Sequence, residues 1–171
     1  MKHILSGILF LFVLYAHQVN AEKFPSGSVA SEPVIFQYAV YLINNHNGNH
    51  TAKAKELLKK SYPFFTLAEE PNPMVPSIRI SLNNKVQTEY APPSLESLQY
   101  FGMGVTKEQA QMLQSATRAL VVDFSLPLEH RVKGLKEASQ FIYDLALQTG
   151  GILWDEETRQ CFGNSTWEEV R

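Results

Sequence analysis

The sequence predicts one α+β domain, in which a mixed or antiparallel sheet packs one face against a long helix. Short apolar runs of strand length recur along the chain. A single long segment near the C-terminus repeats its apolar residues every three or four positions. About 150 residues follow an N-terminal leader, and 44% of the whole chain is hydrophobic, which suits one compact core.

The N-terminus has the pattern of a secretory signal peptide. Lys2 supplies a positive charge, residues 4–15 form an apolar stretch, and Val19 and Ala21 are small residues ahead of a cleavage site expected before Glu22. The apolar stretch is about a dozen residues long, well short of the roughly 20 that span a bilayer. No stable membrane insertion is therefore expected after cleavage.

These boundaries define the expected organisation of the chain. The residues after the leader are rich in Ser, Gly and Pro and lack a hydrophobic period, which is typical of a flexible segment. The chain is divided into a signal peptide at 1–21, a flexible lead-in at 22–32 and a single α+β domain at 33–171. Such a protein is expected in the periplasm or outside the cell.

The domain is expected to begin with a buried strand at 34–43, because β-branched, aromatic and aliphatic residues fill almost all of that run. An Asn-rich turn follows, after which Thr51 is the expected cap of a helix. That helix carries Leu57 and Leu58 on its apolar face and ends before Pro63.

Three prolines within residues 70–77 exclude a helix and predict an extended surface loop. A β-hairpin is expected next. Residues 78–82 alternate apolar and polar side chains, as a strand does, and Asn83 and Asn84 suit a two-residue turn. Residues 86–90 alternate in the same way and are expected to form the return strand.

Two short helices and a strand are expected after the hairpin. Ser94 is the expected cap of a helix that ends at Gly102. Thr106 and Gln109 have the spacing of a capping box, which predicts a second helix start. Residues 119–124 form an apolar run of strand length.

The longest helix is expected at residues 128–149, where Pro127 opens it and Gly150 ends it. Its core-facing residues recur at intervals of three and four: Val132, Leu135, Ala138, Phe141, Ile142, Leu145 and Ala146. Residues 152–154 then form a strand that the crossover rule pairs in parallel with the strand before the helix. A turn and a short return strand follow.

The charge of the chain argues against nucleic acid as a partner. The whole chain has fifteen Lys and Arg residues, and removal of the signal peptide with Lys2 leaves fourteen. All seventeen Asp and Glu residues remain, so the formal charge after cleavage is −3. Binding to phosphate backbones needs many basic residues, and the sequence shows no basic cluster. The glycine-rich phosphate and dinucleotide motifs are also missing from the sequence, so no cofactor is expected.

Neither a metal site nor a nucleophilic thiol is expected. His46 and His50 have the spacing of a helical zinc pair, but the Asn-Gly-Asn between them favours a loop, and a third ligand is not evident. Cys161 is the only cysteine, so no intramolecular disulfide forms. Its immediate neighbours supply no base that would ionise the thiol, which indicates a structural residue.

The densest polar cluster is the segment 154–159, which contains Asp155, Glu156 and Glu157. Two interpretations remain open. Closely spaced carboxylates divide acid and base roles in hydrolases that act on glycans. Alternatively, the Asp opens an ordinary hairpin turn, exposed Glu residues occupy its tip and Arg159 pairs back.

Aromatic residues interleaved with prolines form the candidate binding surface. Phe64 and Phe65 follow a proline, and Tyr90 precedes two more. Exposed together, such preordered aromatic side chains suit the capture of a protein partner, whereas the alternative is that they close the core under the loops. Trp154, as a stacking platform, and Arg159 complete the set of candidate binding residues.

The C-terminal half resembles a known family in its pattern. It runs from a Tyr-Ala-Pro-Pro-Ser segment at 90–94 to GGILWDEETR at 150–159. This order resembles an uncharacterised bacterial family of unknown function with a Gly-Gly-x-x-Trp-Asp-x-x-Thr-Arg ending. The resemblance implies an α+β fold and a bacterial origin, and it implies no catalytic residue.

Two functions from different classes follow from these observations. The leading hypothesis is an exported, non-enzymatic binding domain that recognises a protein or peptide partner in the cell envelope, in a narrower version as an immunity-like or inhibitory protein. The alternative is an envelope hydrolase acting on peptidoglycan or polysaccharide, with Asp155, Glu156 and Glu157 as its candidate carboxylates.

The signal peptide is directly testable. Mass spectrometry of the protein from envelope or culture fractions is expected to find a chain that begins at Glu22, because export removes residues 1–21. An intact chain that begins at Met1 and stays in the cytoplasm contradicts this prediction.

Overall fold

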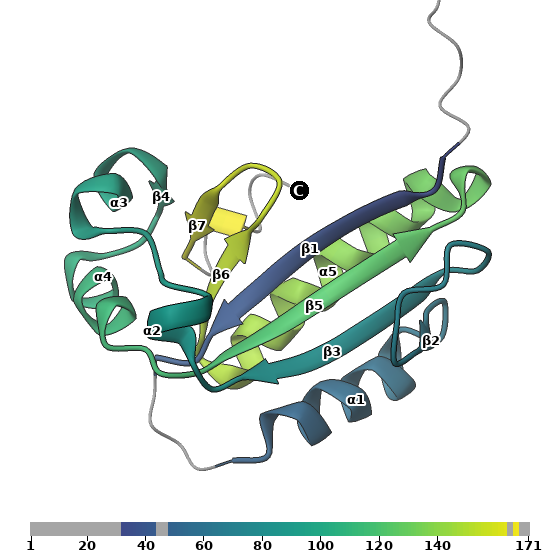
Figure 1. The fold of residues 1–171 in the computed structure, drawn as a ribbon, viewed down its shortest axis with the longest axis horizontal. Coiled ribbons are helices and arrows are strands. Elements are labelled where there is room, and N and C mark those ends of the chain that lie inside the picture. The colour runs from purple at the N-terminus through teal and green to yellow at the C-terminus, as the bar shows by residue number, and fades with distance from the viewer. Residues whose placement is uncertain (1–31, 44–47, 164–165, 168–171) are drawn as a thin grey trace, which may run out of the picture.

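The computed structural model describes residues 32–43, 48–163 and 166–167. The predicted signal peptide and nearly all of the lead-in lie outside these residues. Within them the chain forms a seven-stranded mixed sheet with helices on both faces, and a long helix runs behind the sheet (Figure 1). The predicted α+β fold class is confirmed.

The sheet has the strand order β2-β3-β5-β1-β6-β7-β4. Its centre is antiparallel, since β1 pairs with both β5 and β6, and β5 pairs with β3. Only the outer pairs β2–β3 and β4–β7 are parallel among the described strands. The strands are β1 (Val34–Tyr41), β2 (Thr66–Leu67), β3 (Ser77–Asn83), β4 (Gly102–Met103), β5 (Ala119–Leu126), β6 (Ile152–Asp155) and β7 (Gln160–Phe162).

The helices divide unequally between the two faces. The helices are α1 (His50–Ser61), α2 (Val86–Glu89), α3 (Leu95–Phe101), α4 (Lys107–Gln114), the 3-10 turn η1 (Leu128–His130) and α5 (Arg131–Thr149). α1 and α5 pack with the first face of the sheet. α2, α3 and α4 gather at one end of the second face, and β1, β5 and β3 continue past them without a covering helix (Figure 1).

The first core lies between the sheet and the helices α1 and α5, with Phe124 of β5 at its centre. This ring is fully buried and stacks on Phe36 of β1 at a centroid distance of 5.0 Å. It also meets Phe65 edge-on at 5.2 Å and Phe141 of α5 at 6.3 Å. Aromatic pairs of this geometry stabilise beyond their buried area, so this cluster fixes α5 on the sheet.

A second core lies on the opposite face, because side chains of a strand alternate between faces. Tyr41 of β1, Val121 of β5 and Trp154 of β6 pack there against Leu98 of α3 and Leu113 of α4. This core covers only one end of the face. Towards the start of β1, Ile35 on the same face is 63% exposed.

Several of the predicted helix ends agree with the structure, whereas α5 begins at Arg131, after the 3-10 turn η1, and not at residue 128 as predicted. Thr106 and Gln109 form the expected capping box at the start of α4, with N···O distances of 3.2 and 2.9 Å. Ser94 caps α3, which ends at Gly102. Gly150 ends α5 in the left-handed conformation, at a φ of 62°, where a glycine is favoured.

The predicted hairpin is wrong in its second half. β3 forms as expected, but residues 86–89 form α2 instead of a return strand. The side chain of Asn83 accepts a bond from the amide of Lys85 at 2.7 Å, which turns the chain after β3. Val86 and Tyr90 are four residues apart, so a helix places both against the second core as well as a strand would.

Two local predictions need smaller corrections. Asn49, not Thr51, caps α1, since its side chain accepts a bond from the amide of Ala52 at 3.0 Å. The strands β5 and β6 that flank α5 run parallel but are not neighbours. β1 lies between them and pairs antiparallel with each.

The core-facing side of α5 differs from prediction at its N-terminal end. Val132 is 76% exposed and Leu135 is 41% exposed, although both match the apolar period. Gly134 is buried instead, at a position where any side chain would overlap Leu126. Because successive residues of an α-helix are about 100° apart, Val132 and Leu135 lie about 160° and 100° round the helix from Gly134, away from this contact. The other five predicted core residues of α5 are buried.

No helix within the described part of the chain is both long enough and apolar enough to cross a membrane.

Two leucines of α5 test the assignment of its buried face. Leu145 is fully buried, whereas Leu147 is 48% exposed. We expect Leu145→Ala to lower the free energy of unfolding by about 2–5 kcal/mol, through lost burial and a cavity. Leu147→Ala is expected to change it by about 0.5 kcal/mol or less. Urea denaturation measures both, and similar losses for the two variants would contradict the packing of α5.

Candidate functional site

A row of three polar side chains crosses the uncovered part of the second face. Gln37 of β1, Asp123 of β5 and Arg79 of β3 occupy the same register, so they lie side by side. Gln37 Nε2 donates to Asp123 Oδ1 at 2.5 Å, and Arg79 Nε donates to Asp123 Oδ2 at 2.8 Å. Asp123 is only 7% exposed, and these two donors offset the desolvation of its charge. We call these three residues the Asp123 row.

Tyr90 joins the Asp123 row to a second polar group. Its hydroxyl lies 3.0 Å from Gln37 Oε1 and 3.2 Å from Glu156 Oε2, so two acceptors share one proton. Burial first, and then the nearby Glu156 carboxylate, raise the pKa of Tyr90. The hydroxyl therefore stays protonated and acts as a donor. The hydroxyl of Tyr41 in turn donates to the carbonyl oxygen of Tyr90 at 3.3 Å.

Glu156 is the centre of this second group. Its Oε2 accepts a bond from Trp154 Nε1 at 2.5 Å, and its Oε1 pairs with the guanidinium of Arg159. The guanidinium carbon of Arg159 also lies 5.2 Å from the ring centre of Trp154. Tyr90, Trp154, Glu156 and Arg159 thus form one connected set, which we call the Glu156 cluster.

The three candidate carboxylates of the C-terminal turn do not converge. Asp155 lies on the first face, beside Tyr38 in the register of β1 and β6. Burial first, and then Asp155, raise the pKa of Tyr38 to about 12. Asp155 Oδ1 accepts bonds from the amides of Glu157 and Thr158 at 2.9 and 3.3 Å, as an Asp that opens a turn does.

Glu156 is on the opposite face from Asp155, and Glu157 is exposed at the tip of the turn. This arrangement matches the interpretation of the segment as a hairpin turn in which Arg159 pairs back. Asp155 and Glu156 therefore do not share a site, as the hydrolase hypothesis would require of that pair.

The predicted binding residues separate into two groups. Tyr90, Trp154 and Arg159 come together in the Glu156 cluster, but Trp154 is only 6% exposed and Arg159 lies over its ring. Phe64 and Phe65 belong to the first face. Phe65 is buried and Phe64 is half-buried under the ammonium of Lys133, 4.7 Å from its ring centre. A single exposed surface of these aromatics is therefore not formed.

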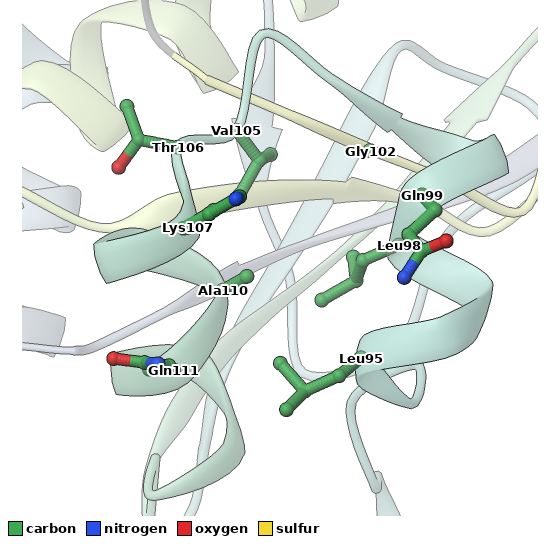
Figure 2. A pocket seen from close by; sticks show the side chains of 9 residues that line it. All are labelled: Leu95, Leu98, Gln99, Gly102, Val105, Thr106, Lys107, Ala110 and Gln111. Carbon is green, nitrogen blue, oxygen red and sulfur yellow. The ribbon is translucent and has the colours of Figure 1, made fainter.

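A groove with a volume of about 600 Å³ lies between α3 and α4. Its nine lining residues are Leu95, Leu98, Gln99, Gly102, Val105, Thr106, Lys107, Ala110 and Gln111. Figure 2 shows Leu95 and Leu98 pointing from α3 towards Val105 and Ala110 on the other side. The floor is therefore apolar, while two glutamine amides and one ammonium supply polar groups around it.

Local sequence fixes the two walls of this groove. The caps at Ser94 and Thr106 set where α3 and α4 begin. Between the helices, β4 pairs with β7 and ties the connection to the sheet. Gly104 follows at a φ of 65°, a conformation that disfavours other residues. The groove is thus preformed by two anchored helices.

The segment that forms the groove also carries exposed apolar side chains, of which Leu95 lines the groove. Five of the large apolar residues that are exposed fall within residues 95–112: Leu95 (48%), Tyr100 (75%), Phe101 (47%), Met103 (37%) and Met112 (38%). Phe101 lines a separate hollow, with Trp154 and Arg159, so these residues do not all belong to the groove. The prediction from sequence missed this surface. The available signal was that α3 carries more apolar residues than one buried face needs.

Cys161 and His50 belong neither to the Glu156 cluster nor to the groove between α3 and α4. Cys161 is fully buried in the second core, and burial raises the pKa of its thiol to about 12, which suits a structural residue. His50 is buried at the start of α1, and His46 lies outside the described residues. Among the residues that the structure describes, no three His, Cys, Asp or Glu side chains group as a metal site would require.

Comparison of the chain with protein-family models, with curated proteins and with solved structures gave no match. The resemblance of the C-terminal half to an uncharacterised bacterial family stays a prediction.

The Glu156 cluster is expected to stabilise the fold. Glu156→Gln removes the charge that Trp154, Tyr90 and Arg159 share, so we expect it to lower the free energy of unfolding by about 1–3 kcal/mol. Trp fluorescence is expected to shift, because the partner of the Trp154 indole changes. Glu157→Gln at the exposed tip is the matched control and is expected to change stability by about 0.5 kcal/mol or less. Equal effects of the two variants would show that the cluster contributes nothing.

Proposed function

We propose that this chain is an exported binding domain that recognises a protein or peptide partner in the cell envelope. The groove between α3 and α4 is its contact surface. The occupant that best suits this groove is an amphipathic segment of a protein partner, with apolar side chains that enter the groove and polar groups at its edges. The export part of the proposal rests on the signal-peptide pattern of residues 1–21.

The observation that carries the proposal is the preformed groove itself, with the apolar side chains of Leu95, Leu98, Val105 and Ala110 in its lining. A volume of about 600 Å³ is in the range of sites that enclose several apolar groups. Binding in a groove whose walls are already ordered costs little conformational entropy. Leu95 in the lining is 48% exposed, so a bound segment removes its apolar area from water.

The polar residues of the groove indicate the chemistry of the partner. The amides of Gln99 and Gln111 each donate and accept hydrogen bonds, so they suit backbone groups of a bound segment. Lys107 makes no salt bridge with a described carboxylate, and it favours an acidic residue beside the apolar anchors. This is the mode in which an apolar helix face lies in a groove, with acidic flanks.

Two leucines of equal exposure make a matched test. Leu95 lines the groove and Leu147 lies on α5 behind the sheet, and each is 48% exposed. The partner is first captured from envelope extract and then purified. Leu95→Asp places a charge in the groove, so we expect it to weaken the affinity for this partner by tenfold or more. Calorimetry measures the affinity. Leu147→Asp is expected to leave the affinity unchanged.

The contradicting outcome is equally specific. An affinity that is the same for the unmodified chain, Leu95→Asp and Leu147→Asp would remove the groove as the contact surface. Circular dichroism of each variant shows that it remains folded before binding is compared.

A further inference from the structure

Arg79 has donors that the fold does not use. Only its Nε bonds to another described residue, Asp123, although a guanidinium carries five N–H donors. The side chain is 42% exposed, so its terminal nitrogens have access to a ligand. Arg79 is in register with Asp123 on the second face and is not among the residues that line the groove between α3 and α4.

The Asp123 row holds Arg79 in one orientation. The carboxylate of Asp123 is fixed by Gln37 on its other side, and Gln37 is fixed in turn by the hydroxyl of Tyr90. Three strands and the end of α2 thus determine where the guanidinium lies. A free arginine loses rotamer entropy when it binds an anion, but here much of that loss has already occurred on folding.

A polar groove of about 450 Å³ lies beside this row. Gln37 belongs to both the row and the groove, and Ser81, two residues beyond Arg79 on the same face of β3, forms part of its floor. Asn83 and Asn84 contribute further amides to its lining. These four side chains donate and accept hydrogen bonds without carrying charge, so they suit an extended backbone. The rest of the lining consists of Tyr90, the apolar Leu82 and Val121, and the charged Lys85 and Glu89, which pair with each other.

We infer that Arg79 is the anchor of a second binding site, which takes the carboxylate of a peptide ligand that lies along the polar groove. The planar fork of a guanidinium matches a carboxylate with two parallel hydrogen bonds. A carboxylate is favoured over a phosphate, because Asp123 and Glu70 already act on Arg79 electrostatically and a dianion would be repelled more strongly. The carboxylate belongs to an acidic side chain or to a chain terminus.

Nuclear magnetic resonance of the Arg79 Nε–H group tests this site in the unmodified protein. The probes are N-acetylglutamate α-amide for a side-chain carboxylate, N-acetylalanine for a chain terminus, and N-acetylalanine amide as the neutral control. We expect a saturable shift of the Arg79 resonance with at least one of the two carboxylate probes and none with the neutral amide. The stronger of the two carboxylate probes identifies the source. No saturable shift with either carboxylate, or an equal shift with the neutral amide, overturns the inference.

Two variants and one anion complete the test. Arg79→Lys keeps the charge but lacks the fork, so the carboxylate affinity, followed through amides of β3, is expected to fall about tenfold or more. Arg131→Lys changes an exposed arginine at the start of α5 and is expected to leave the carboxylate affinity unchanged. Unchanged affinity in Arg79→Lys, or tighter binding of inorganic phosphate than of either carboxylate, overturns the inference. Because the site is separate from the groove between α3 and α4, these results do not depend on the proposed function.

Discussion

All eight residues of β5 are buried, and this constraint determines how the rest of the chain is arranged. A strand buried on both faces needs cover on both sides of the sheet. α1 and α5 supply that cover on the first face, whereas α2, α3 and α4 supply it at one end of the second face only. Beyond those helices, the side chains of Gln37 and Arg79 contact and cover Asp123. The unequal division leaves one stretch of the second face without a covering helix.

Asp123 is the charged residue within this buried strand, and its carboxylate connects the parts of the second face. Gln37 and Arg79 satisfy it directly, and Tyr90 extends the connection from Gln37 to Glu156. A polar chain that is fully satisfied stabilises one arrangement, because any displaced member would leave a buried group without a partner. These hydrogen-bonded polar side chains fix the end of α2, and α3 and α4 follow α2 in the sequence. The hydrogen bonds therefore also contribute to the position of the groove.

Sequence reasoning succeeds here where the signal is local. The capping box of α4, the glycine at the end of α5 and the turn opened by Asp155 each depend on residues within a few positions. It failed at residues 86–89, because apolar residues at i and i+4 fit a helix as well as a strand. The polar chain was beyond local prediction, since Gln37 and Asp123 are 86 positions apart and are brought together only by strand pairing. The groove was missed because α3 and α4 are too short to show a clear period.

The central claim is that the second face, at the groove between α3 and α4, is where a partner binds. Photo-crosslinking in intact cells tests it most directly, with a photoreactive amino acid placed at Gln111 beside the groove or at Lys136 on the exposed side of α5. Both positions are exposed, so both can report contact. The account predicts a discrete crosslinked product from Gln111 and none from Lys136. Products of equal yield from both positions, or a product from Lys136 alone, would contradict it.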